Sequence, residues 1–113
     1  MDEMTAIDLF EALSNDTRLA AFRLLVRAGP DGLPAGEIAE QLGVVQNTMS
    51  SHLHRLARAG VVNSRRESRR IIYCVDFTIV RELIVFLMED CCDGSAEVCE
   101  PIAESLASQE GRS

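Results

Sequence analysis

The fold of this 113-residue chain is decided by residues 46–60, which read QNTMSSHLHRLARAG. On a helical wheel Met49, Leu53 and Leu56 fall on one side, with Val45 in line with them just before the helix. The opposite side is small and polar near its start and basic near its end. Its members are Asn47, Ser51, His54, Arg55 and Arg58. The pattern predicts a helix that buries one side and offers the other to the major groove of DNA.

The segments on either side of this helix complete a recognisable unit. A short helix over 35–42 ends at Gly43, so a turn of three residues joins the two helices, which is typical of a helix-turn-helix motif. After Gly60 the residues favour strands over 61–66 and 69–75, with Glu67-Ser68 between them. We expect these strands to form a hairpin, the wing. Its tip is flanked by two arginine pairs, which are Arg65, Arg66, Arg69 and Arg70.

Three more helices are predicted outside this unit. Residues 5–13 carry an apolar stripe, and Asn15 is expected to cap a helix over 16–28. Asp76 is expected to cap a last helix over 77–90, which is apolar around most of its circumference and must therefore be buried. In so short a chain, the simplest burial is against a second copy across a two-fold axis. The predicted class is mainly α with a β-hairpin wing (α+β), a winged helix-turn-helix.

The charge of the chain is unevenly distributed. The formal net charge is −7, yet residues 46–75 hold six arginines and one acid, a balance of +5. The basic region thus coincides with the predicted helix and wing, which indicates duplex DNA as a partner. The alternative is an ordinary solvated helix face, but two adjacent arginine pairs repel each other unless an anion lies between them. The candidate DNA-binding residues are Gln46, Asn47, Thr48, Ser50, Ser51, His54, Arg55, Arg65, Arg66, Arg69 and Arg70. At the edge of the apolar side, His52 is expected to pack and not to bind DNA.

Composition sets the remaining limits. Residues 1–92 are expected to form one domain for DNA binding and dimerisation, followed over 93–113 by a loop and a tail. The longest apolar run, 83–88, is far too short to span a membrane, and the acidic N-terminus does not look like a signal peptide. We therefore expect a cytoplasmic protein without a membrane partner. Its four cysteines are then expected to be thiols.

Three of these cysteines gather around the end of the last helix. Cys91 and Cys92 are adjacent, and Cys99 follows after a segment that can reverse at Gly94. Three thiolates with no nearby histidine make a soft site. Zinc would prefer a fourth ligand, whereas three sulfurs suit As(III) or Sb(III). A thiol redox switch, a sensor of another soft metal and incidental tail thiols remain alternatives. The fourth, Cys74, lies in an alternating apolar run and is expected to be a small buried residue.

An enzyme is the alternative from a different class of function. A thiol-dependent reductase needs an activated thiolate near a base or a positive dipole. The cysteines follow a helix C-terminus amid carboxylates, and no histidine follows His54. We therefore expect no enzymatic activity.

Several stretches carry a family resemblance that covers roughly residues 5–90. Residues 12–19 (ALSNDTRL), 37–39 (EIA), 46–56 (QNTMSSHLHRL) and 59–62 (AGVV) resemble the ArsR/SmtB family of metal-sensing repressors. The resemblance implies a homodimer joined through the first and last helices. It also implies binding to inverted-repeat operator DNA and release when an effector binds. The implied DNA contacts fall mainly on Gln46, Asn47, Ser50 and Ser51, with Asn47 where many members have Pro or Ser.

The resemblance also narrows the effector. Residues 33–39 lack the cysteines that arsenic repressors of the best-known type carry there, and residues 77–90 lack the histidine of the zinc site in SmtB-like members. A third type of arsenic repressor has a vicinal cysteine pair and a further cysteine after the last helix. Cys91, Cys92 and Cys99 resemble that set, which implies As(III), with Sb(III) as the alternative, as effector and no organic cofactor.

Overall fold

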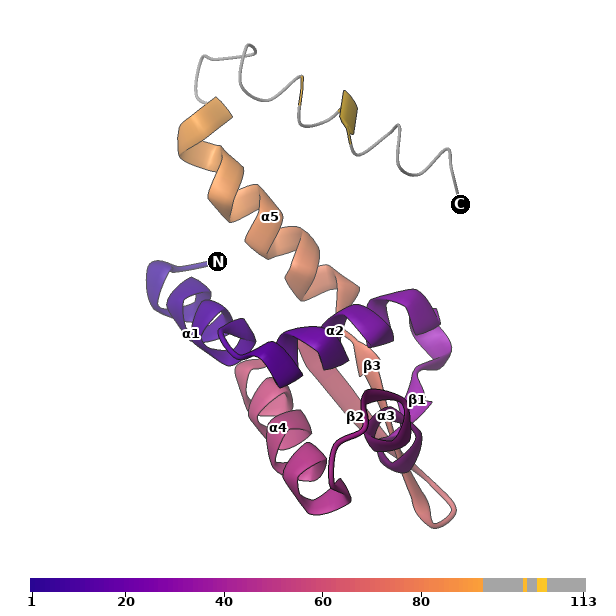
Figure 1. Ribbon diagram of the computed structural model, residues 1–113. Coiled ribbons are helices and arrows are strands. Elements are labelled where there is room, and N and C mark those ends of the chain that lie inside the picture. Colours follow the sequence, from indigo (N-terminus) through magenta and orange to yellow (C-terminus); the bar gives the residue numbers. More distant parts are fainter. Residues whose placement is uncertain (93–100, 102–103, 106–113) are drawn as a thin grey trace.

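The computed structural model describes residues 1–92, 101 and 104–105, with the backbone alone for Asp90, Cys91 and Cys92. Figure 1 shows a body of helices around a small sheet, with a hairpin at one end and the last helix extending from the other. The elements are α1 (Glu3–Leu13), α2 (Asp16–Ala28), the 3-10 turn η1 (Gly29–Asp31), β1 (Leu33–Pro34), α3 (Ala35–Leu42), α4 (Gln46–Ala59), β2 (Val62–Glu67), β3 (Arg70–Val75) and α5 (Phe77–Cys92). The predicted winged helix-turn-helix is confirmed.

Local signals set the helix boundaries much as predicted. The side chain of Asn15 accepts a hydrogen bond from the backbone N–H of Arg18 at 3.0 Å and so caps α2. Asp76 does the same for α5, since its Oδ1 accepts from the N–H of Ile79 at 3.2 Å. At the other end of α3, Gly43 takes a left-handed conformation with a φ of 65°, which ends the helix.

The sheet has one strand more than the sequence predicts. β2 and β3 pair antiparallel. β1 pairs antiparallel with the other edge of β3, with Leu33 opposite Tyr73, so β3 is the central strand. In the wing Glu67 lies opposite Arg70, so the turn is Ser68-Arg69 and the predicted Glu67-Ser68 is wrong by one residue. The left-handed φ of 57° at Ser68 marks the true turn position.

The core draws one or more buried side chains from each of the five helices. Leu9 of α1, Leu25 of α2, Ile38 of α3, Leu53 of α4 and Leu83 of α5 all belong to one cluster, which the sheet covers on one side. Burying a leucine-sized side chain is worth roughly 1.5–3 kcal/mol. The shared cluster therefore holds the helix-turn-helix, the wing and the first half of α5 in one body.

Two expectations about burial need correction. Val45 was expected in line with the buried side of α4, yet 73% of it is exposed. The reason is that Val45 precedes the first turn with an extended backbone (ψ 136°), so the helical wheel does not apply to it. Cys74 of β3 was expected to be buried, but it is only half-buried.

The helices are also too short or too polar for a membrane. Within the described ranges 1–92, 101 and 104–105, none could cross a bilayer.

The close approach of Gly32 to β3 yields a stability prediction. Gly32 has a φ of 68°, and a Cβ there would overlap the carbonyl oxygen of Tyr73. Gly43 has a similar φ of 65°, but a Cβ there would meet no heavy atom within 4 Å. We expect Gly43→Ala to lower the free energy of unfolding by about 1–2 kcal/mol through backbone strain alone. Gly32→Ala should cost clearly more, and urea denaturation followed by circular dichroism measures both. Equal losses would contradict the close approach.

Candidate nucleic-acid interface

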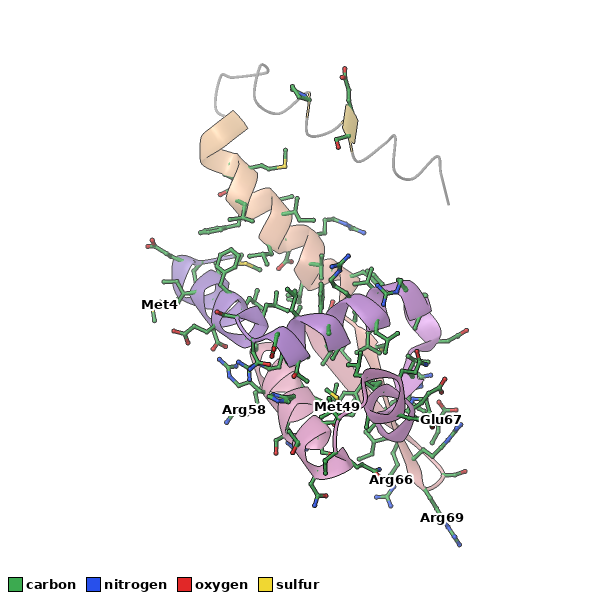
Figure 2. The ribbon with its side chains drawn as sticks, viewed as in Figure 1. Met4, Met49, Arg58, Arg66, Glu67 and Arg69 are labelled. Atoms are coloured by element: carbon green, nitrogen blue, oxygen red, sulfur yellow. The ribbon has the colours of Figure 1, made fainter. Side chains whose placement is uncertain are left out.

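α4 is fixed in its rotation by one buried stripe. Met49, Leu53 and Leu56 are fully buried, and Figure 2 shows Met49 pointing into the body of the molecule. The turn before α4 is held by α3, because the N–H of Val44 donates to the carbonyl of Ala39 at 3.0 Å. Since residues three and four apart share a helix face, the opposite face of α4 is turned outward.

The outward face is the polar one that the sequence predicts. Its side chains are small at the beginning of the helix and basic toward its end, as major-groove readout requires. The predicted residues found exposed on α4 are Gln46, Asn47, Thr48, Ser51 and His54, while Ser50 is half-buried. Arg58 is exposed as well.

The wing carries its four arginines on exposed positions. Figure 2 shows Arg66 and Arg69 extending from the wing away from the body. Arg65 is engaged within the chain. Its Nε donates to Glu67 at 3.0 Å and its Nη2 donates to the carbonyl of Asp31 at 2.7 Å. Arg65 therefore fastens the wing to η1, a role that the sequence did not indicate.

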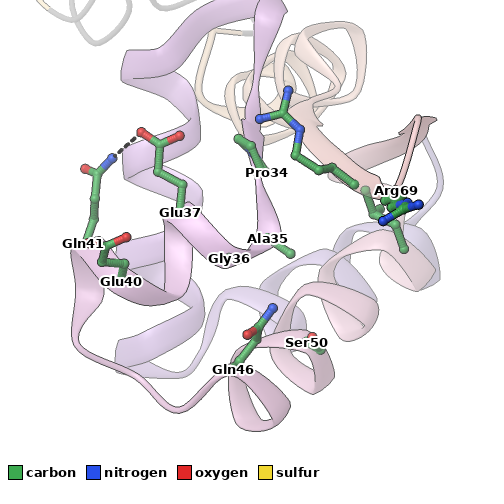
Figure 3. Close-up of a pocket in the computed structure, with 11 residues that line it drawn as sticks. Pro34, Ala35, Gly36, Glu37, Glu40, Gln41, Gln46, Ser50 and Arg69 are labelled. Atoms are coloured by element: carbon green, nitrogen blue, oxygen red, sulfur yellow. Dashed lines mark hydrogen bonds between the residues drawn. The ribbon is translucent and has the colours of Figure 1, made fainter.

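A groove separates the wing from the helix-turn-helix. Figure 3 shows the wing with Arg69 on one side of it and Gln46 and Ser50 on α4 below. Gln46 lies over Gly36, since a Cβ on Gly36 would be 3.7 Å from its Nε2. The lining residues are Pro34, Ala35, Gly36, Glu37, Glu40, Gln41, Gln46, Ser50, Arg69, Arg70 and Ile71.

The two walls of this groove carry opposite charges. Glu37 and Glu40 are exposed on the α3 wall, and Glu37 accepts a hydrogen bond from Gln41 at 3.2 Å. Arg69 and Arg70 stand on the wing wall. Because carboxylates repel phosphate, a DNA backbone fits the wing wall and not the α3 wall. The sequence analysis did not single out these acids.

One predicted DNA-binding residue faces α1 instead. The Nη2 of Arg55 lies 3.1 Å from Asp8 and 3.9 Å from Glu11, and its side chain is 23% exposed. The arginine thus pairs with acids of α1 that lie beside α4, and part of its charge is used within the chain. Its sequence neighbours on the outward face, His54 and Arg58, are free of such contacts among the described residues.

A second contact between α1 and α4 was not predicted at all. The Nε of Arg18 donates to the carbonyl of Ala12 at 2.6 Å, and its Nη1 lies 3.3 Å from Nδ1 of His52. A single guanidinium therefore joins the end of α1 to the middle of α4. This contact agrees with the expected packing role of His52. The sequence offered one indication of a role for Arg18, its position inside the ALSNDTRL stretch that carries the family resemblance.

The candidate ligand site lies at the other end of the molecule. Cys91 and Cys92 are the last residues of α5, which runs two residues further than predicted, and Figure 1 shows this end opposite the wing. Cys99 falls outside the described residues. No group of three His, Cys, Asp or Glu side chains suited to a metal occurs among those described.

Known proteins with this architecture regulate transcription. Residues 13–65 match a family described as a helix-turn-helix domain. The transcriptional activator HlyU of Vibrio cholerae is 33% identical over 82 residues, which cover 73% of each chain. Its solved structure has a TM-score of 0.64 at 30% identity and covers 82% of this chain and 100% of that one.

Two further solved structures are informative. One is a homodimeric winged helix-turn-helix DNA-binding domain from Mycobacterium bovis, described as a possible ArsR-family regulator. It has a TM-score of 0.63 at 27% identity and covers 76% of this chain and 79% of that one. The other is the antimony-specific transcriptional repressor AntR. It has a TM-score of 0.58 at 32% identity and covers 80% of this chain and 78% of that one.

Fold, site and relatives together define a winged helix-turn-helix transcriptional regulator. Within that class the chain belongs to the family of ArsR/SmtB-type regulators. Its relatives are named as regulators and not as enzymes, which confirms the expectation that it has no catalytic role.

The exposed wing arginines yield a prediction about salt dependence. Replacing Arg69 and Arg70 together by alanine should weaken binding to duplex DNA. It should also reduce the slope of log affinity against log salt by about 1 for each lost phosphate contact. Fluorescence anisotropy with a labelled duplex over a series of KCl concentrations measures both effects. Arg23→Ala is the control, because Arg23 is exposed on α2. Equal slopes for the double variant and the control would exclude the wing from the interface.

Proposed function

We propose that this protein is a homodimeric repressor that binds inverted-repeat operator DNA and releases it on binding As(III), with Sb(III) as the alternative. The observation that carries the effector part is the placement of a vicinal cysteine pair at the end of α5. α5 is also one of the helices whose apolar side chains stay exposed in the single chain. The effector site and the dimer interface would thus lie on the same helix.

Dimerisation is supported by apolar side chains that the single chain does not bury. On α5 these include Ile84, Val85 and Leu87, and on α1 they include Ile7 and Phe10. Exposed apolar residues grouped on two terminal helices are typical of a subunit interface. The homodimeric neighbour from Mycobacterium bovis supports the same assembly.

DNA binding is supported by the outward face of α4 and by the wing. A two-fold dimer presents two copies of α4, which read half-sites about one helical turn apart when they enter successive major grooves. The wing arginines then lie beside the phosphate backbone. Operator symmetry would thus follow from protein symmetry.

The effector is supported by the chemistry of the donor set. Cys91, Cys92 and Cys99 supply three sulfurs, a set that suits the trigonal-pyramidal As(III) better than tetrahedral zinc. Arsenous acid is neutral, and each thiol that forms an As–S bond gives its proton to the departing hydroxyl group, which leaves as water. The similarity to AntR, an antimony-specific repressor, supports a metalloid ligand. No organic cofactor is needed.

Release requires that a change in α5 reach α4. α1 offers a route from the proposed interface to α4. Arg18 joins the end of α1 to His52 of α4, and Arg55 of α4 pairs with Asp8 of α1. A movement of α5 that repacks α1 at the interface would therefore change the spacing of the two reading helices. The coupling must be reciprocal, so bound operator weakens arsenite binding by the same factor.

The proposed interface yields a prediction about assembly. Val85 on α5 and Ile71 on the wing have similar exposed fractions, 52% and 46%. We expect Val85→Asp to convert the dimer to a monomer, because a buried unpaired carboxylate is strongly unfavourable. Ile71→Asp should leave the dimer intact. Sedimentation equilibrium measures both, and a dimeric Val85→Asp protein would contradict an interface through α5.

The cysteines yield a prediction about release. Arsenite should dissociate the wild-type protein from upstream DNA in a gel shift, and Cys91→Ser/Cys92→Ser and Cys99→Ser should each abolish the response at the same dose. Cys74→Ser is the matched control, because this half-buried wing thiol lies 17 positions before Cys91, outside α5, and should respond like wild type. An unchanged dose response in the double variant would exclude the site. Release by peroxide as effective as release by arsenite would identify a redox switch instead.

A further inference from the structure

Val45 is exposed to an unusual degree for an apolar residue in a protein body. At 73% exposure it matches Met4 near the N-terminus and exceeds every other large apolar side chain that the structure describes. It lies directly before α4 with an extended backbone. No element within the described part of the chain covers it, so its solvent contact is a feature that needs a reason.

The residue also occupies a position where a polar side chain would stabilise the helix. α1, α2 and α5 begin after Asp2, Asn15 and Asp76, whose side chains accept hydrogen bonds from the first turn. Val45 occupies the corresponding position of α4 and makes no such bond. Pro34 before α3 makes none either, but it is half-buried in β1. When an exposed position departs from the preference for a polar cap, the departure indicates a functional constraint.

The surroundings of Val45 point to its contact. Figure 1 shows the beginning of α4 and the wing at the same end of the molecule, away from the end of α5. The next residue, Gln46, lines the groove together with Ser50 and Arg69. A second copy docked on α5 would therefore leave Val45 uncovered. DNA on the outward face of α4 would meet it first, because the N-terminal residues of a reading helix approach the base edges.

The major groove offers one apolar group of matching size, the C5 methyl of thymine. We propose that Val45 contacts a thymine methyl group in each half-site and so determines part of the operator sequence. The inference rests on the proposed binding of DNA through α4, and it adds a specificity residue whose side chain acts by apolar contact alone. Removing one methyl contact should weaken binding about fourfold for each half-site.

The test uses duplexes that the full chain enriches from a random-sequence library. Each thymine of the enriched duplex is replaced in turn by deoxyuridine, which lacks only the methyl group, and affinity is measured by anisotropy. We expect one thymine in each half-site at which the replacement weakens wild-type binding about fourfold. The Val45→Ser variant should bind the thymine duplex and the corresponding deoxyuridine duplex equally. This variant should remain folded, because serine is a favoured cap.

Val26→Ser is the matched control, since Val26 is another exposed valine, on α2. It should keep the wild-type sensitivity to deoxyuridine. Wild-type binding that is insensitive to every replacement would overturn the role of Val45 and leave DNA binding intact. Sensitivity that persists in Val45→Ser would overturn it too. Failure of the wild-type chain to enrich any sequence would instead contradict the proposed function.

Discussion

The burial of Met49, Leu53 and Leu56 is the constraint on which the rest of the molecule depends. These three side chains fix the rotation of α4 about its own axis. The opposite face of the helix must then point outward. The core that receives them also anchors Leu83 of α5. The orientation of the reading face and the attachment of the last helix are therefore set by the same apolar cluster.

Most of the fold could be predicted because its boundaries depend on local signals. Asn15 caps a helix and Gly43 ends one through contacts within a few residues, and such signals are visible in the sequence. β1 escaped prediction because it is two residues long and exists only through pairing with β3, about forty positions away. Val45 was misplaced because the helical period was extended to a residue that precedes the first turn of α4.

The candidate interface was predictable in composition but not in its internal pairing. The polar face of α4 and the exposed wing follow from residue type and period. The engagement of Arg55 by Asp8, 47 positions away, follows from the packing of α1 against α4, which no local pattern reveals. The same holds for Arg65 with Asp31 and for the acids of α3 opposite the wing. An arginine count alone therefore overstates the positive charge available to a polyanion.

The cysteine pair stands at the end of α5, remote from α4 and the wing (Figure 1). This separation has an evolutionary consequence. Under the proposed function, mutations at the cysteine pair that exchange one inducer chemistry for another leave the outward face of α4 untouched. Mutations on α4 that retarget the protein to new genes leave the inducer site untouched. The two specificities can diverge independently, so a lineage can combine an inherited reading surface with a newly acquired sensor in a small number of steps.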